Sequence, residues 1–149
     1  MPEKKTIKRA RKARRKGKAT STQAGEFVRE EMEHIREGKH GARSTKQAIA
    51  IGLSKARRAG VKLRPPARGR TSQKTRRSAE RAYRQGQKRS GARPNRKRSR
   101  ASSAALKREG RRAASRTALA RQARQQSRKR SARERSAIAR KAARTRQRG

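Results

Sequence analysis

The chain of 149 residues carries 51 Lys and Arg against nine acidic residues, and its formal net charge is +42. Such an excess repels itself in any compact state and is compensated most directly by a polyanion. Only 28% of the residues are hydrophobic, and the aromatic residues are Phe27 and Tyr83. We therefore expect neither a large core nor a dry catalytic pocket, and the composition argues against an enzyme.

The chain also lacks the usual signals for export or membrane insertion. It contains no Cys, which removes disulfides and thiolate metal sites. The basic N-terminal run is not followed by an apolar stretch of signal-peptide length, and no span reaches the roughly 20 apolar residues of a membrane helix. These features predict a cytoplasmic protein without membrane contact.

Composition divides the chain into three segments, which are a basic arm over residues 1–20, a more apolar segment over 21–63 and a basic tail over 64–149. Pro65 and Pro66 mark the last boundary, because a proline disfavours helix at the residue before it. The tail is rich in Arg, Ala and Ser. We expect it to be disordered to about residue 100 and helix-prone from about residue 104, becoming helical on binding.

The middle segment predicts two helices. The first runs from about Gln23 to Glu37, with Ser21 or Thr22 as its cap and Gly38 at its end. Its apolar face consists of Phe27, Val28, Met32 and Ile35. Its polar face carries five glutamates, and we expect this acidic face to stay away from phosphate. These acidic residues are Glu26, Glu30, Glu31, Glu33 and Glu37.

The second helix begins after Ser44, which forms a capping box with Gln47, and Gly60 ends it. Its apolar face consists of Ile49, Leu53 and Ala56, with Val61 and Leu63 folding back. Packing of the two faces gives the predicted fold class: mostly α and disordered, with a small two-helix hairpin flanked by basic arms. A hairpin of about 40 residues is marginal alone, so self-association through it stays open, and Ile51 is either a contact with a second copy or a singly exposed residue.

The charge predicts a nucleic-acid partner held through its phosphates. Sequence-specific readers of single strands stack bases on aromatic rings, which this chain nearly lacks, so duplex DNA is favoured and structured RNA comes second. The predominance of Arg in the tail also favours DNA. The residues expected to bind nucleic acid are Lys46, Lys55, Arg57, Arg58, Lys62, Arg111, Arg112, Arg116, Arg121, Arg124, Arg128, Lys129, Arg130, Arg140, Lys141 and Arg144.

Motifs for metal binding, cofactors or catalysis are not evident. His34 and His40 are the two histidines, and Glu30 lies four residues before His34, but no third ligand follows from the spacing. There is no phosphate-binding loop and no nucleophile motif. We therefore expect no metal, no cofactor, no small-molecule substrate and no catalytic residue. The two helices could also form a helix-turn-helix reader, but the connection between them is longer than usual for that motif.

The stretch GEFVREEMEHIREGKHGARSTKQAIAIGLSKARRAGVKL, residues 25–63, resembles an uncharacterised family of short basic bacterial proteins. This resemblance implies a bacterial cytoplasmic setting and supplies no activity or ligand. The tail is similar in composition to the basic tails of linker-histone-like and protamine-like proteins.

The leading interpretation is a non-enzymatic, sequence-indifferent DNA-binding protein that compacts or bridges duplexes in the bacterial nucleoid. One alternative is an RNA-binding or ribosome-associated basic protein. A second is a protein-interaction module, in which residues 21–63 recruit a partner through the acidic face and the tail is an electrostatic anchor.

Overall fold

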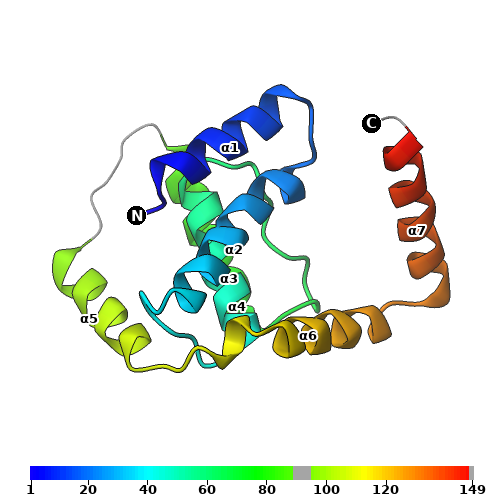
Figure 1. The fold of residues 1–149 in the computed structure, drawn as a ribbon. Coiled ribbons are helices and arrows are strands. Elements are labelled where there is room, and N and C mark those ends of the chain that lie inside the picture. Colours follow the sequence, from blue (N-terminus) through cyan, green and yellow to red (C-terminus); the bar gives the residue numbers. More distant parts are fainter. Residues whose placement is uncertain (89–94, 148–149) are drawn as a thin grey trace. The chain divides into compact units, whose positions relative to one another are not determined.

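The computed structural model describes residues 1–88 and 95–147, and the secondary structure in these ranges is helical (Figure 1). The chain divides into two compact units, Met1–Ala114 and Ser115–Gly149, which are described separately. The helices of the first unit are α1 (Lys4–Arg15), α2 (Thr20–Arg36), α3 (Thr45–Arg58), α4 (Gln73–Gln87), α5 (Arg96–Lys107) and the 3-10 turn η1 (Arg112–Ala114). The second unit contains α6 (Arg116–Arg128) and α7 (Ala132–Gln147).

The predicted fold class, a two-helix hairpin between disordered basic arms, is wrong. Residues 4–15 of the N-terminal arm form α1, and the part of the tail expected to be disordered contains α4 and the start of α5. Residues 89–94 of that part lie outside the described residues. The error has a physical cause: α1 buries Thr6 and Ala10 and α4 buries Ala79 and Ala82, while most cations of both helices are exposed, so charge repulsion does not prevent packing.

The core of the first unit forms around α2 and α3, with α1 packed on α2 and α4 packed on α3. Its central cluster combines Ala10 of α1, Ala24 and Phe27 of α2, Ala56 of α3 and Val61 after α3. The side chains Ile7, Leu53 and Leu63 pack against this cluster. Because three of the five residues in the central cluster are alanines, the helices can approach closely, and the core forms with few bulky apolar side chains.

The two predicted helices exist and pack together, but within a larger bundle. Phe27, Met32 and Ile35 are buried as expected, whereas Ile49 and Ile51 are only partly buried. Ile51 is therefore not an exposed apolar residue of the kind considered for self-association. In the part of the chain that the structure describes, no helix is long and apolar enough to cross a membrane.

Two glycines set the distances between helices. A Cβ atom added to Gly52 of α3 would lie 2.7 Å from the Cα atom of Val28 in α2. A Cβ atom added to Gly86 of α4 would overlap the carbonyl oxygen of Arg57 in α3. At both crossings main chain faces the glycine, so no side-chain movement can make room for a larger residue.

Residues 106–114 belong to the first unit because they dock on the connection between α2 and α3. The N–H group of Gly41 donates to the carbonyl of Leu106 at 2.8 Å, and that of Ala42 donates to Gly110 at 3.1 Å. The hydroxyl of Thr45 donates to the carbonyl of Ala113 at 2.7 Å. The boundary predicted after residue 63 therefore falls inside a compact unit.

The helix ends follow local rules in most places. Both α2 and α3 end before a glycine with positive φ, Gly38 and Gly60, as predicted. However, α2 begins at Thr20 without a side-chain cap, so the predicted cap at Ser21 or Thr22 is wrong. In the second unit Ser131 caps α7: its hydroxyl accepts from the N–H of Glu134 at 3.2 Å, and its own N–H donates to the Glu134 carboxylate at 2.9 Å.

The predicted cap of α3 at Ser44 is confirmed. Replacing Ser44 with alanine removes this cap and is expected to lower the free energy of unfolding by about 1 kcal/mol. The Ser44 hydroxyl accepts from the N–H of Gln47 at 3.2 Å. Thermal and urea denaturation followed by circular dichroism measures the change. Ser21→Ala is the matched control, since Ser21 lies in the uncapped first turn of α2. Equal losses in the two variants would contradict a specific capping role for Ser44.

Candidate nucleic-acid interface

The acidic residues are engaged within the chain. All nine glutamates lie in the described ranges, and each contacts another residue of the protein. The contacts are Glu3 with His34 and Lys39, Glu26 with Arg9, Glu30 and Glu31 with Lys55, Glu33 with Arg29, Glu37 with Lys39, Glu80 with Arg84, Glu109 with Arg43 and Glu134 with Ser131. Only Glu30 and Glu31 are buried, so it is pairing within the chain, more than burial, that offsets the acidic groups and leaves a positive excess.

The acidic face predicted for α2 is only partly present. Glu30 is 3% exposed and Glu31 is fully buried. Glu33 and Glu37 remain on the surface, where they pair with Arg29 at 2.9 Å and Lys39 at 2.9 Å. The expectation of a continuous acidic surface on this helix is therefore wrong, because α1, α3 and the connection after α2 cover part of it.

Local hydrogen bonds also shift the titration of two surface groups. A hydrogen bond with His34 is the main cause that holds the pKa of Glu3 below its ordinary value. A hydrogen bond with Glu37 is the main cause that raises the pKa of Lys39. Both shifts favour the charged forms, so the Glu3 carboxylate and the Lys39 ammonium group stay charged at neutral pH.

Of the predicted binding residues on α3, two point inward. The ammonium group of Lys55 contacts Glu31 and lies 3.7 Å from Glu30. Arg57 is 6% exposed, its Nε donates to the carbonyl of Leu63 at 3.2 Å, and burial lowers the pKa of its guanidinium group. Both side chains are engaged inside the first unit, so we leave them out of the proposed interface.

The other predicted binding residues are exposed. In the first unit these are Lys46, Arg58, Lys62, Arg111 and Arg112. In the second unit they are Arg116, Arg121, Arg124, Arg128, Lys129, Arg130, Arg140, Lys141 and Arg144. Neither α6 nor α7 has a buried residue.

Spacing in the second unit aligns several of these arginines on one face of each helix. Residues three, four and seven positions apart share a helix face. This spacing defines two basic stripes. The α6 stripe consists of Arg121, Arg124 and Arg128, and the α7 stripe consists of Arg133, Arg140 and Arg144. Arg133 is exposed but was not among the predicted residues, although its separation of seven from Arg140 is visible in the sequence.

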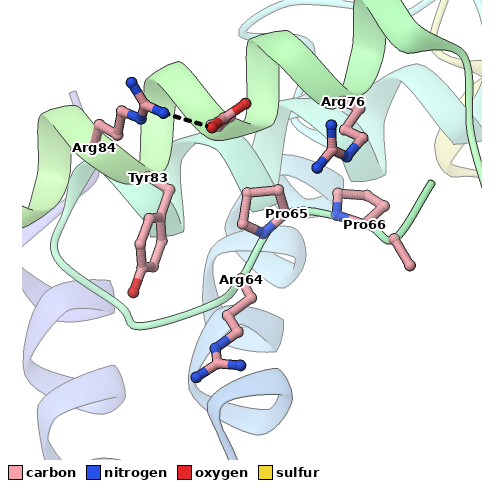
Figure 2. A pocket seen from close by; sticks show the side chains of 8 residues that line it. Arg64, Pro65, Pro66, Arg76, Tyr83 and Arg84 are labelled. Atoms are coloured by element: carbon pink, nitrogen blue, oxygen red, sulfur yellow. Dashed lines mark hydrogen bonds and ion pairs between the residues drawn. The ribbon is translucent and has the colours of Figure 1, made fainter.

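A second feature, the arginine–tyrosine hollow, lies between α4 and the segment that precedes it (Figure 2). It has a volume of about 410 Å³ and contains Tyr83, Pro65 and Pro66. Its basic side chains are Arg64, Arg76 and Arg84. Arg84 donates to Glu80 at 2.7 Å, whereas the Nε atom of Arg76 is buried without a hydrogen-bond partner.

The hollow combines guanidinium groups with an aromatic ring, which are the groups that contact phosphates and stack on unpaired bases. Sequence reasoning missed it because Tyr83 is a lone aromatic residue and Arg64 comes from a segment outside α4, although Arg76 lies seven residues before Tyr83 on the same face of α4. The packing of residues 64–67 along α4 adds Arg64, Pro65 and Pro66 to the side chains that α4 already places together.

Comparisons with known proteins found nothing similar. No protein-family model matches the chain, and neither a curated protein nor a solved structure does. The resemblance of residues 25–63 to a family of short basic bacterial proteins therefore stays a prediction.

Proposed function

We propose that this protein binds nucleic acid through backbone phosphates without reading base sequence, and that duplex DNA in the bacterial nucleoid is its principal partner. The observation that supports the proposal is the separation of charge. The nine glutamates are paired with residues of the same chain, whereas exposed cations cover α6, α7 and much of the first unit. A surface of this kind attracts a polyanion at long range and holds it by contacts that do not depend on sequence.

The second unit carries more net charge per residue than the first unit does as a whole. Residues 115–149 contain 13 Lys and Arg and one Glu. Duplex DNA carries two charges per base pair, so this net charge of +12 matches about six base pairs. Because Arg binds phosphate oxygens in a bidentate manner, the two basic stripes are suited to successive phosphates.

A specific observation also favours RNA as a second candidate partner. Phe27 is 1% exposed and cannot stack on a base, but Tyr83 lies in the arginine–tyrosine hollow. An unpaired base on this ring, with its phosphates near Arg64 and Arg76, would be a contact that duplex DNA cannot make. The protein-interaction alternative has less support, because part of the acidic face that it requires is buried.

A competition assay with the full-length protein separates the two partners. We expect random-sequence duplex DNA to displace a labelled duplex at least as well as a ribosomal RNA fragment does at equal phosphate concentration. Two unrelated duplexes should bind with dissociation constants within about twofold of each other, and the affinity should fall steeply with salt. Fluorescence anisotropy at several salt concentrations measures the displacement by each competitor, the two dissociation constants and their dependence on salt.

The substitution Tyr83→Leu is the matched variant, because it removes the ring and leaves every charge in place. Unchanged binding of duplex DNA is expected. Displacement of the duplex by ribosomal RNA at tenfold lower concentration, together with loss of that preference in Tyr83→Leu, would contradict the DNA proposal and establish the RNA alternative.

A further inference from the structure

Glu31, His34 and His40 converge inside the first unit. Glu31 and His34 lie one turn apart on α2, and His40 lies on the connection to α3. One donor atom from each residue lies within 4.8 Å of the other two. The Nδ1 atom of His34 lies 4.0 Å from Oε1 of Glu31, and the Nε2 atom of His40 lies 3.5 Å from Oε2. The side chains are 0%, 14% and 16% exposed, respectively.

Hydrogen bonds on the far side of each ring fix the orientation of both histidines. The Nε2 atom of His34 lies 2.8 Å from a carboxylate oxygen of Glu3, and the Nδ1 atom of His40 lies 3.0 Å from the carbonyl oxygen of Gly41. Both partners are acceptors, so these nitrogens carry the hydrogen in each neutral ring. The remaining nitrogens, Nδ1 of His34 and Nε2 of His40, then carry the lone pairs, and they lie 4.0 Å and 3.5 Å from the two carboxylate oxygens of Glu31.

The charge of Glu31 is only partly balanced by its surroundings. Its Oε1 atom accepts from Lys55, whereas its Oε2 atom is buried and has no hydrogen-bond partner. The same ammonium group lies 3.7 Å from the buried Glu30, so one cation serves two buried carboxylates. A buried carboxylate that is not fully paired destabilises the folded state. A further cation bound at Oε2 would therefore stabilise the first unit.

We propose that Glu31, His34 and His40 bind a divalent transition-metal ion, with Zn²⁺ the best match to the donors. Two imidazoles and one carboxylate form a common zinc ligand set, and water commonly completes the tetrahedron. Ligands about 2.0–2.1 Å from zinc lie about 3.4 Å apart, so side-chain shifts of about 1 Å close the site. The bound ion ties the connection between α2 and α3 to α2.

The surroundings of the site match those of metal-binding histidines. A ligating histidine usually donates its other N–H to a carboxylate or a backbone carbonyl, and here Glu3 and Gly41 supply these two acceptors. Sequence spacing points to Glu30 as the helical partner of His34, and this pair alone predicts no site. The structure instead directs Glu31 to both rings, and His40 supplies the third ligand that spacing could not reveal.

Titration of the full-length protein with Zn²⁺ alone tests the proposal, after nuclease digestion and a high-salt wash have removed bound nucleic acid. We expect one equivalent to bind by calorimetry, and Co²⁺ to give the visible absorption of a tetrahedral site. His34→Gln and His40→Gln should each weaken Zn²⁺ binding by at least about tenfold, since each removes a ligand. Glu33→Gln is the matched control, because Glu33 lies on the same helix and pairs outward with Arg29.

Folding defects are separated from ligand loss in two ways. Circular dichroism reports whether each variant keeps its helices, and Glu3→Gln leaves all three ligands in place while weakening the orientation of His34. We expect Glu3→Gln to lower the affinity by about 10- to 100-fold. No Zn²⁺ uptake by the wild-type protein, or an unchanged affinity in folded His34→Gln and His40→Gln variants, would overturn the proposal.

Discussion

Neutralising the two basic stripes of the second unit is expected to remove most of the affinity of the protein for duplex DNA. The variant carries glutamine in place of Arg121, Arg124, Arg128, Arg133, Arg140 and Arg144. Each phosphate contact adds about 0.9 to the slope of log affinity against log salt, so six lost contacts should reduce this slope by about 5. At moderate salt the affinity should fall by about a hundredfold or more. Anisotropy titrations over a range of salt concentrations measure both effects.

A pair of double variants tests whether position matters beyond net charge. Arg121→Gln with Arg124→Gln removes two cations of the α6 stripe. Arg29→Gln with Arg84→Gln removes two cations that already pair with Glu33 at 2.9 Å and Glu80 at 2.7 Å. The first pair should reduce the salt slope by about 1.8 and the second by much less. Equal reductions would show that the interface is not concentrated in the second unit.

Replacing Gly52 with alanine is expected to destabilise the first unit by about 1–3 kcal/mol or more. The new methyl group would lie 2.7 Å from the Cα atom of Val28, where main chain cannot yield without moving α2 away from α3. A loss of this size is a large share of the stability of a small domain. Chemical denaturation of the full-length variant, followed by circular dichroism, measures it.

Replacing Gly25 with alanine should instead stabilise the first unit. Gly25 lies within α2, and a Cβ atom there meets nothing within 4 Å. Alanine favours the helix by about 0.5–1 kcal/mol over glycine when no contact is disturbed. Stabilisation by Gly25→Ala together with destabilisation by Gly52→Ala would confirm the close crossing, whereas two stabilising substitutions would refute it.

Local signals in the sequence were sufficient to predict both ends of α3 and its packing on α2. The Ser44–Gln47 cap and the terminal Gly60 depend on neighbouring residues only, and such rules transfer well from sequence to structure. The additional helices α1 and α4 were missed because their buried faces consist of small residues, such as Ala10, Ala79 and Ala82. Composition alone predicts little hydrophobic stabilisation from burying alanine. Close packing of the helices adds van der Waals contacts that compensate for the small side chain.

The candidate interface could be predicted only in part for a related reason. The exposed arginines of α6 and α7 follow directly from composition, since these helices have no buried residues. Lys55 was predicted to bind nucleic acid, whereas in the structure it contacts Glu31; it lies seven residues after the buried Ala48 and thus on the same helix face. The histidine–glutamate cluster depends on the path of the chain between α2 and α3, which no local pattern specifies.

The internal pairing of the glutamates leaves the outward charge of this protein almost independent of pH. Of its 51 basic residues 35 are Arg, whose guanidinium groups stay protonated, and the remainder are Lys. Guanidinium and ammonium groups ordinarily carry their charge from about pH 5 to about pH 9. Occupancy of a polyanion site made in this way responds to ionic strength and to the concentration of competing polyanions, so changes in salt rather than acidity control release.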